Sequence, residues 1–252
     1  MRSIHGGRHE LGQNFLVHPP TLHRIRELVA GTDGPILELG PGDGALTTEL
    51  MGLGRELRAI ELDEHRVRRL RNRHPGLDVR HGDALRVRYD RPVVVGNIPF
   101  HITTPLLRRL LAHGTWRHAI LLTQWEVARK RAGVGGATMM TAQSAPWFEF
   151  TLHGRVPAHR FRPVPSVDGG ILEITRRGSP LLPASERFGY ERFVREVFTG
   201  RGRGIARILQ ALGHRSADVQ RVGIRPDALP RDLGAEQWAR LWLITRRTLG
   251  ER

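Results

Sequence analysis

The amino-acid sequence predicts an α/β protein with a parallel β-sheet, followed by a small α-helical domain. Up to about residue 175, short apolar runs alternate with helical patterns, which is typical of a parallel sheet with helices on both faces. Beyond that point the pattern changes to helical segments separated by proline and glycine. The length of 252 residues suits one large domain with a small additional one.

The first part of the chain contains the predicted sheet. Five apolar runs are its predicted parallel strands: residues 36–39, 57–62, 77–80, 93–95 and 119–122. Three helical patterns lie between them: residues 47–53, 64–72 and 105–112. Residues 148–153 and 170–175 are predicted to pair as a later, hairpin-like set of strands. Residues 156–167 between them hold three prolines, so this stretch is predicted to be a loop.

The last third of the chain is predicted to be a separate helical domain. Residues 176–185 contain one glycine and two prolines, a composition typical of a linker. Four helical patterns follow: residues 186–198, 203–212, 217–222 and 235–249. We therefore divide the chain into a first domain, residues 1–178, and a second domain, residues 179–252.

The charge of the chain is strongly basic and unevenly distributed. Its 40 Lys and Arg outnumber 25 Asp and Glu, giving a net charge of +15. Residues 176–252 carry 16 basic and 8 acidic side chains, so the C-terminal third is the more basic part per residue. Lys130 is the only lysine, and arginine suits phosphate groups and stacks on bases. The balance predicts a nucleic acid or another polyanion as partner.

Several protein classes are excluded by composition. The absence of cysteine rules out disulfides, thiolate metal sites and cysteine nucleophiles. The sequence has no apolar run near the length of a membrane span, so no membrane partner is expected. The first ten residues lack the apolar core of a secretory signal. We therefore expect a cytoplasmic protein.

A glycine-rich loop follows the first predicted strand. Residues 38–44 read Glu-Leu-Gly-Pro-Gly-Asp-Gly and precede a predicted helix. Glycine at Gly40 and Gly42 lets the backbone approach a ligand closely. The spacing differs from the Gly-x-Gly-x-x-Gly of dinucleotide-binding folds. Considered alone, the loop is also consistent with a tight turn that binds nothing.

Two acidic residues favour a nucleoside-containing ligand. Glu61 ends the second predicted strand, about twenty positions after Gly40, where an acidic side chain can accept hydrogen bonds from ribose hydroxyls. Asp83 follows the third predicted strand, where a carboxylate can accept from the amino group of adenine. A solvated loop aspartate is the alternative interpretation of Asp83.

The segment Asn97-Ile98-Pro99-Phe100 follows the strand at 93–95 and is the most specific motif. An aromatic amino group is a poor nucleophile because its lone pair is delocalised into the ring. The Asn97 side-chain oxygen and the Ile98 carbonyl can both accept from such a group and direct its lone pair. Pro99 fixes the direction of the carbonyl, and Phe100 offers a face on which a base stacks. A strand-end turn with a buried phenylalanine is the competing interpretation.

Together these motifs resemble the rRNA adenine-N6 methyltransferases that use S-adenosylmethionine. Within them the chain looks like the Erm group, which methylates 23S rRNA and confers macrolide resistance. Seven motifs match in order: residues 9–16, 38–44, Glu61, 82–84, 97–100, 124–128 and 161–168. The resemblance implies a Rossmann-like class I methyltransferase sheet with a small C-terminal helical domain, S-adenosyl-L-methionine as cofactor, and no metal.

The resemblance also implies roles for individual residues. The residues expected to line the cofactor pocket are Gln13, Asn14, Leu16, Gly40, Gly42, Glu61, Leu62, Asp83, Ala84 and Asn97. Asn97, Ile98 and Phe100 are expected to be catalytic by holding the target adenine, and Phe161 is expected to close the base pocket. The implied substrate is a single-stranded or loop adenine of 23S rRNA, and the protein is expected to be a monomer.

Basic residues are the candidates for phosphate contacts. Residues 199–207 alternate arginine with glycine, a pattern that can follow a curved backbone. The arginines of this run and a second group near the motif side of the sheet are the predicted RNA-binding residues: Arg201, Arg203, Arg207, Arg108, Arg109, Arg129, Lys130 and Arg131. The competing interpretation of the glycine–arginine run is a solvated turn between domains.

Other functions fit the sequence less well. A 16S-type adenine dimethyltransferase more often carries Asn-Leu-Pro-Tyr at the catalytic motif. A DNA adenine methyltransferase usually has a separate target-recognition domain, for which about 70 C-terminal residues leave no room. A catalytically silent RNA-binding or transcription-factor relative would not need Glu61 and an intact Asn97 motif, and a dehydrogenase is disfavoured by the glycine spacing.

Overall fold

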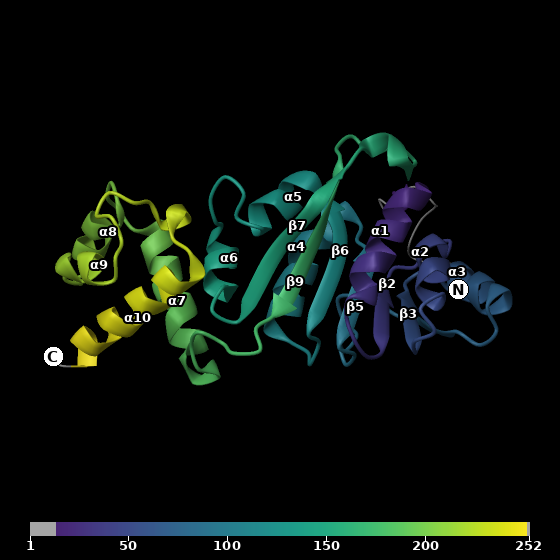
Figure 1. Ribbon diagram of the computed structural model, residues 1–252, viewed down its shortest axis with the longest axis horizontal. Helices are drawn as coiled ribbons and strands as arrows, with labels where there is room; N and C mark the ends of the chain where they lie inside the picture. Colours follow the sequence, from purple (N-terminus) through teal and green to yellow (C-terminus); the bar gives the residue numbers. More distant parts are fainter. Residues whose placement is uncertain (1–13, 251–252) are drawn as a thin grey trace, which may run out of the picture. The chain divides into compact units, whose positions relative to one another are not determined.

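The computed structural model describes residues 14–250, and Gln13 therefore lies outside the described residues. The strands are β1 (Phe15–Leu16), β2 (Ile36–Leu39), β3 (Leu57–Glu61), β4 (Asp78–His81), β5 (Val93–Asn97), β6 (His118–Gln124), β7 (Phe148–Val156), β8 (Phe161–Arg162) and β9 (Gly169–Arg176). Seven of them form one sheet in the order β4-β3-β2-β5-β6-β9-β7 (Figure 1). The short strands β1 and β8 pair with each other.

Helices connect and flank these strands. The α-helices are α1 (Pro19–Ala30), α2 (Ala45–Met51), α3 (Glu64–Arg73), α4 (Thr103–Ala112), α5 (Trp125–Arg131), α6 (Met139–Ser144), α7 (Arg187–Thr199), α8 (Ile205–Ala211), α9 (Ala217–Arg221) and α10 (Ala235–Gly250). Short 3-10 helices are η1 (Phe100–Ile102), η2 (Ala158–Arg160), η3 (Ala184–Glu186) and η4 (Pro230–Asp232).

The centre of the sheet is parallel, which confirms the predicted fold class. β3, β2, β5 and β6 are parallel neighbours, and β4 extends the parallel set beyond β3. β9 then pairs with β6 in the antiparallel direction. All five predicted parallel strands are present. Because they run in the same direction, their carboxyl ends meet at one edge of the sheet.

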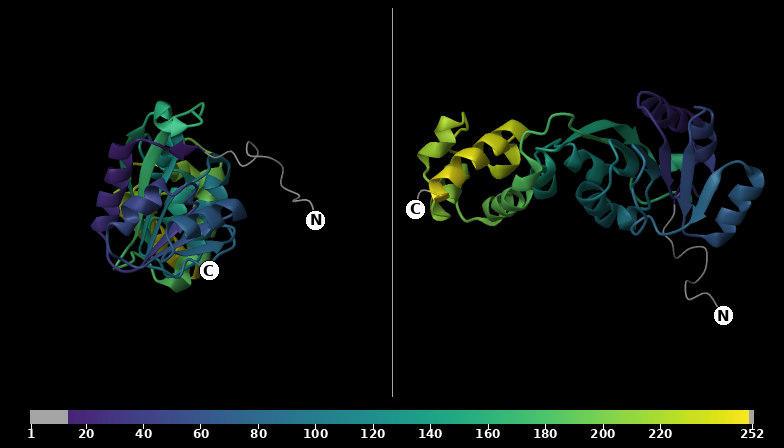
Figure 2. Two further views of the ribbon diagram at one scale, coloured as in Figure 1. Left: turned by 90° about the vertical axis from the view of Figure 1, so that its right-hand side faces the viewer. Right: turned by 90° about the horizontal axis from the view of Figure 1, so that it is seen from below.

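Both faces of the sheet are buried, which explains why its strands are continuous apolar runs. On one face, Val93 and Val95 pack in a core with Ile25 of α1 and Leu50 of α2. Val94 is fully buried on the opposite face, since successive strand residues alternate between faces. Figure 2 shows α1 and α4 on opposite sides of the sheet. Four buried leucines of α4 complete this second layer.

Two expectations about local structure differ from the observed fold. The prediction of an unbroken loop at 156–167 is wrong, because η2 and β8 lie within it. β8 forms through its pairing with β1, which local sequence does not indicate. α1 was not among the predicted helices. It begins with Pro19 and Pro20 at its first positions, where proline costs no hydrogen bond, and its buried side chains follow helical spacing.

The described residues divide into two compact units. The first contains residues 14–128 and Thr151–Thr175, and the second contains Arg129–Phe150 and residues 176–250. The second unit has an aromatic core in which Phe193 packs against Trp238 and Trp242, and Tyr190 against Trp147. The four helices predicted from residue 186 onward are confirmed within two residues at each end. The domain boundary at residues 178 and 179 stays a prediction.

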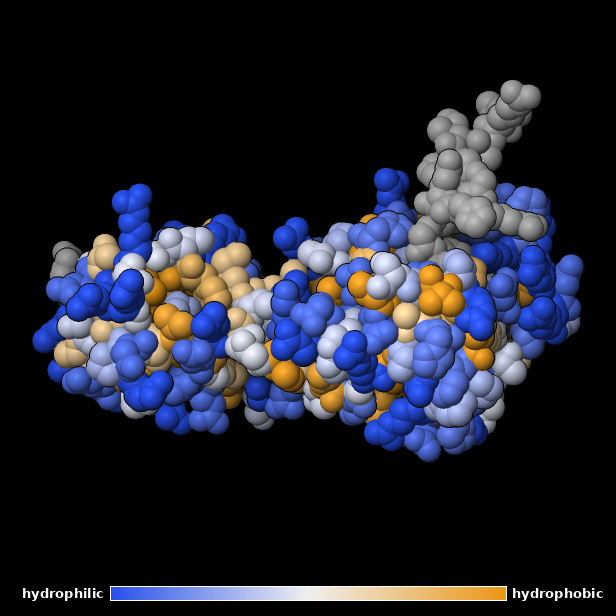
Figure 3. All heavy atoms as spheres, turned by 90° about the horizontal axis from the view of Figure 1, so that it is seen from above, coloured by the Kyte–Doolittle hydropathy of each residue, from blue (hydrophilic) through white to orange (hydrophobic). Residues whose placement is uncertain are grey.

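The surface is largely polar. Figure 3 shows one face on which hydrophilic side chains predominate and hydrophobic ones gather in small patches. Within residues 14–250, no helix combines the length and the apolar character that a membrane span needs. Among the residues whose burial the structure describes, Phe188 on α7 is the most exposed large hydrophobic residue, at 81%.

Candidate active site

The parallel strands bring the predicted cofactor and catalytic segments to one edge of the sheet. The glycine loop follows β2, Glu61 ends β3, Asp83 follows β4, and Asn97 ends β5. In open α/β sheets, ligands bind outside the carboxyl ends of the strands. The four segments therefore meet where the fold provides a binding site.

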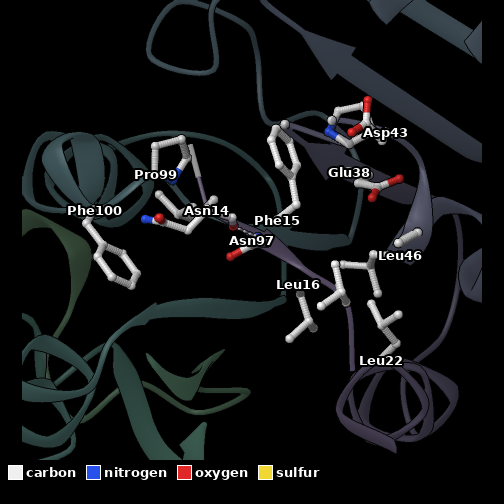
Figure 4. Close-up of a pocket in the computed structure, with 16 residues that line it drawn as sticks. Asn14, Phe15, Leu16, Leu22, Glu38, Asp43, Leu46, Asn97, Pro99 and Phe100 are labelled. Atoms are coloured by element: carbon white, nitrogen blue, oxygen red, sulfur yellow. Dashed lines mark hydrogen bonds between the residues drawn. The ribbon is translucent and has the colours of Figure 1, made fainter. Parts of the chain in front are cut away.

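A cavity of about 140 Å³ opens at this edge (Figure 4). Most of its lining comes from the segment before α1, the glycine loop and the catalytic motif. The lining residues of the cavity are Asn14, Phe15, Leu16, Val17, Leu22, Glu38, Gly40, Pro41, Gly42, Asp43, Ala45, Leu46, Asn97, Ile98, Pro99 and Phe100. Of the predicted site residues, the cavity brings together Asn14, Leu16, Gly40, Gly42, Asn97, Ile98 and Phe100. Glu61, Leu62, Asp83 and Ala84 lie outside its lining.

The glycine loop has the backbone that its sequence predicts. Gly40, Gly42 and Gly44 have φ angles of 67°, 59° and 87°, in the left-handed region that favours glycine. A Cβ atom on Gly40 would meet nothing within 4 Å, so this glycine faces open space at the cavity. A Cβ atom on Gly42 would lie 2.7 Å from Cε1 of the Phe15 ring. The loop is thus open for a ligand at Gly40 and closely packed at Gly42.

We expect Gly42→Ala to destabilise the fold by about 1–2 kcal/mol, because alanine pays the left-handed backbone cost and also displaces Phe15. The same displacement should weaken cofactor binding. Urea unfolding and calorimetric titration with S-adenosylmethionine measure the two effects. Gly76→Ala is the matched control, since Gly76 has no positive φ and open space around it. An unchanged unfolding midpoint for Gly42→Ala would show that the loop tolerates a side chain there.

Glu61 is buried and holds the glycine loop. Its Oε2 accepts a hydrogen bond from the Gly42 amide at 3.0 Å, and its Oε1 accepts from the Asp63 amide at 3.0 Å. Each carboxylate oxygen keeps a further lone pair. The predicted contact with a ribose therefore stays a prediction, and a role in shaping the loop is added to it.

The other predicted nucleoside-binding residues lie on the neighbouring strand ends. Leu62 follows β3 and is about half exposed. Asp83 accepts a hydrogen bond from the Leu85 amide at 2.8 Å, and the Ala84 carbonyl accepts one from the Tyr89 hydroxyl at 2.7 Å. These hydrogen bonds fix the turn after β4. Roles of these residues toward an adenine stay predictions.

Asn97 is oriented by a contact with the N-terminal segment. Its Nδ2 donates a hydrogen bond to the Asn14 carbonyl at 2.7 Å, as the dashed line in Figure 4 shows. With the amide nitrogen held in this way, the side-chain oxygen is left as the acceptor. The Ile98 amide donates to the Leu122 carbonyl of β6 at 2.9 Å, which anchors the motif to the sheet.

Two aromatic rings flank the catalytic motif. Phe100 begins η1 and remains partly exposed. The Phe161 ring packs edge-on against it, with 6.5 Å between ring centroids. Phe161 itself is fully buried. Phe161 therefore supports the Phe100 ring from the protein interior. Its closure of the base pocket stays a prediction.

The two later motifs are also adjacent in space. The Trp125 amide donates to the Asp168 carbonyl at 2.8 Å, joining residues 124–128 to residues 161–168. The Asp168 side chain accepts from the Ala158 amide, and this bond lowers the pKa of its carboxyl group. β8, within the second motif, pairs with β1, so Leu16 lies opposite Phe161. Phe15 also lines the pocket; it lies within the motif at residues 9–16, but the sequence assigned it no role.

The predicted RNA-binding residues differ in how they are held. Arg109 donates to the carbonyls of Arg86 and Val87 and lies over the Tyr89 ring, so it has a structural role. Within the second unit, Arg129 donates a hydrogen bond to the Val134 carbonyl, and Arg131 donates one to the Thr138 hydroxyl. The remaining five are exposed and form no ion pair among the described residues: Arg108, Lys130, Arg201, Arg203 and Arg207. Contacts of all eight with RNA stay predictions.

No metal cluster accompanies this cavity. Across residues 14–250, no group of three or more His, Asp or Glu side chains is placed to hold a metal ion.

Comparison with known families decides what kind of enzyme this is. The profile described as "Ribosomal RNA adenine dimethylase" matches residues 4–246, nearly the whole chain. The chain belongs to this family. The predicted activity, S-adenosylmethionine-dependent methylation of rRNA adenine, is thereby confirmed, as is the predicted cofactor.

Individual members of the family are similar over most of their length. The chain is 54% identical to the mycinamicin-resistance protein MyrB of Micromonospora griseorubida, over 96% of this chain and 80% of that protein. It is 50% identical to an rRNA adenine N-6-methyltransferase of Corynebacterium diphtheriae, over 82% of this chain and 83% of that protein. The crystal structure of the 23S rRNA methyltransferase ErmE superposes with a TM-score of 0.82 at 34% identity, covering 92% of this chain and all of that one.

The cavity fits the family's cofactor. Gly40 leaves room for close backbone approach, and Asn14 and Leu16 face the same space. Glu38 adds a buried carboxyl oxygen with no hydrogen-bond partner, which suits a cationic ligand. These residues, with Gly42 and Asn97, are the ones that would hold S-adenosylmethionine.

Proposed function

We propose that this enzyme methylates the N6 amino group of an unpaired adenine in 23S rRNA and thereby confers resistance to macrolide-type antibiotics. Two similarities support the choice of 23S rRNA and of resistance. MyrB is named as a mycinamicin-resistance protein, and ErmE is named as a 23S rRNA methyltransferase. Both resemblances extend over nearly the full chain, so they include the second unit as well as the catalytic one.

The orientation of Asn97 carries the proposal. Because Nδ2 donates to the Asn14 carbonyl, the side-chain oxygen is available to accept from an exocyclic amino group. A second acceptor is the Ile98 carbonyl, whose direction is set by Pro99. Two acceptors on one amino group draw it toward tetrahedral geometry and localise its lone pair. Alignment of this kind is the main contribution a protein makes to a direct displacement.

The reaction places few chemical demands on the protein. Bound S-adenosylmethionine supplies an activated methyl group. The adenine leaves its stack to reach Asn97, and Phe100 offers its partly exposed ring as a new stacking surface. After transfer, the nitrogen carries an acidic proton that it releases to water. The need to extrude the base favours an adenine in a loop or single strand.

The choice between 23S and 16S rRNA is tested by offering both transcripts to the enzyme. We expect labelled methyl groups to enter the 23S transcript at one adenine, which mass mapping of nuclease fragments locates. Transfer to paired adenines near the 3′ end of the 16S transcript would instead favour the small-subunit dimethyltransferases. The mass of the modified nucleoside then separates one methyl group from two.

We propose that the second unit, residues 179–252 in particular, binds the RNA backbone. Arg201 and Arg203 are exposed and form no ion pair among the described residues, so their charge is free for phosphates. Arg195 on α7 is exposed in the same way. Other arginines of the second unit, such as Arg240, are by contrast paired with carboxylates.

The double variant Arg201→Ala/Arg203→Ala is expected to bind RNA more weakly at low salt. The slope of log affinity against log salt should become shallower by about 0.7–0.9 for each phosphate that the variant no longer neutralises. Filter binding at several salt concentrations measures it. Arg225→Ala/Arg240→Ala removes the same charge from arginines that already face Asp227 and Glu236, and should change the slope less. Equal salt slopes for the two double variants would contradict the assignment of Arg201 and Arg203 as phosphate contacts.

Phe188 is a further candidate for RNA contact that the sequence did not indicate. Arg192 and Arg195 follow it by four and seven positions, so all three share the outer face of α7. Phe188→Ala should weaken RNA binding by about 1–3 kcal/mol if a base stacks on the ring. Phe188→Leu should lose the same amount and Phe188→Trp should retain affinity. Binding by the leucine variant at the level of the wild type would contradict stacking.

The enzyme is further proposed to act as a monomer in the cytoplasm, where rRNA is transcribed. Light scattering, at the protein concentration used in activity assays, measures whether the protein is a monomer.

A further inference from the structure

One buried acid in the cofactor cavity takes no part in orienting the adenine. Glu38 lies in β2, immediately before the glycine loop, and lines the cavity. It is only 1% exposed, and its Oε2 forms no hydrogen bond. The Thr47 hydroxyl on α2 is likewise buried without a partner of normal geometry. Figure 4 shows the Glu38 carboxyl group among the cavity residues, in the region of Phe15 and Leu46.

No positive charge neutralises this carboxyl group. Glu38 and Asp43 are the only charged residues that line the cavity within the described part of the chain. Asp43 pairs with Arg69 at 3.1 Å and with Arg66 at 3.8 Å, so its charge is compensated. Glu61 on β3 is a second acid near Glu38, and its oxygens are taken up by backbone amides. β5 presents only valine beside Glu38, at Val95.

A buried carboxylate without a partner is costly, so the group takes up a proton instead. Burial raises the pKa of Glu38 to about 8, and the nearby charge of Glu61 acts in the same direction. Thr47 opposes the shift only in part. Near neutral pH, the empty cavity therefore holds a protonated Glu38.

We propose that Glu38 is the counter-ion of the cofactor, which ionises when the cationic methionine part of S-adenosylmethionine enters the cavity. That part of the ligand carries a sulfonium, an ammonium and a carboxylate group and is cationic overall, and either positive charge would stabilise the Glu38 carboxylate in a low dielectric. The proton of the Glu38 carboxyl group passes to solvent or buffer. Cofactor binding is then coupled to the release of one proton, independently of which RNA the enzyme methylates.

The coupling between proton release and binding fixes how the affinity for S-adenosylmethionine changes with pH. Below a pH of about 8, binding must expel the proton, so the affinity for S-adenosylmethionine rises with pH. One linked proton limits the change to tenfold for each pH unit. The amine of the free ligand also titrates, but the free ligand is the same in every titration. Comparing variants therefore isolates Glu38.

Calorimetry tests the proposal without any catalytic turnover. Wild-type enzyme is titrated with S-adenosylmethionine between pH 6 and 7.5 in buffers of different ionisation enthalpy, which counts the protons released. We expect nearly one proton for the wild type and about one fewer for Glu38→Gln, with an affinity for that variant that varies less with pH. Methylthioadenosine, which lacks both positive charges, should release none from the wild type.

Two outcomes would overturn the proposal. One is equal proton release by wild type and Glu38→Gln, and the other is release with methylthioadenosine. If Glu38→Gln fails to bind the ligand at all, the wild-type proton count still decides, because a value near zero at pH 7 contradicts it. Urea unfolding of the ligand-free proteins gives an independent check. As the pH rises from about 5 to 8, wild type should lose stability relative to Glu38→Gln, since the folded pKa lies above the unfolded value.

Discussion

Replacing Asn97 with alanine is expected to lower methyl transfer by at least a hundredfold. The variant loses the oxygen that accepts from the adenine amino group, and removal of one such preorganised group costs about 10²–10³ in rate. It also loses the Nδ2 bond to the Asn14 carbonyl, so the segment beside the cavity is held less firmly. The loss should fall on kcat. Single-turnover transfer of labelled methyl to a 23S fragment measures it.

Two comparisons separate catalysis from binding at Asn97. Calorimetric affinity for S-adenosylmethionine should change only a few-fold in Asn97→Ala, because most of the cavity lining remains. Asn97→Asp keeps an acceptor oxygen but cannot donate to the Asn14 carbonyl, so its activity should lie between those of alanine and wild type. Near wild-type transfer by Asn97→Ala would show that the amino group is oriented by other atoms.

The second large effect is expected at Glu61. Glu61→Gln keeps one oxygen and places an NH₂ group against the amide of either Gly42 or Asp63. Hydrogen bonds to a charged group contribute about 1.5–3 kcal/mol, so we expect the dissociation constant of S-adenosylmethionine to rise by about tenfold or more. Calorimetry measures this change.

A control shows whether the effect is specific to this carboxylate. Glu64→Gln, three positions later and largely exposed, should leave cofactor affinity within about twofold, since surface charges contribute little. Because Glu61 also holds the glycine loop, its variant should melt at a lower temperature. Unchanged affinity together with a lower melting temperature would restrict Glu61 to the loop and remove the ribose contact.

The parallel core was predictable because each strand carries its own signal. Val93–Val95 is apolar at every position since both faces of β5 are buried, and the strand then ends in Gly96 and Asn97. β1 and β8 were not predictable, because strands of two residues have no periodicity and form only by pairing across the chain. The inclusion of residues 129–150 in the second unit likewise depends on long-range interactions, such as the Gln143 bond to the Glu191 carbonyl.

The site was predictable where it follows a strand end. Gly40, Gly42, Asn97 and Phe100 meet in the cavity because parallel strands end at the same edge. Phe15 was missed because its packing on Gly42 depends on the course of the N-terminal segment. Glu38 was within a recognised motif, yet its significance depends on burial and on the absence of a partner for Oε2 among the described residues, which only the folded structure reveals.

The most direct test of the central claim is the chemical identity of the methylated nucleoside. A 23S transcript is incubated with the enzyme and S-adenosylmethionine, digested to nucleosides and analysed by mass spectrometry. The site at Asn97 predicts adenosine methylated on N6, at one position, and no product with Asn97→Ala. A methyl group on a ribose hydroxyl or on another base would contradict the proposed chemistry.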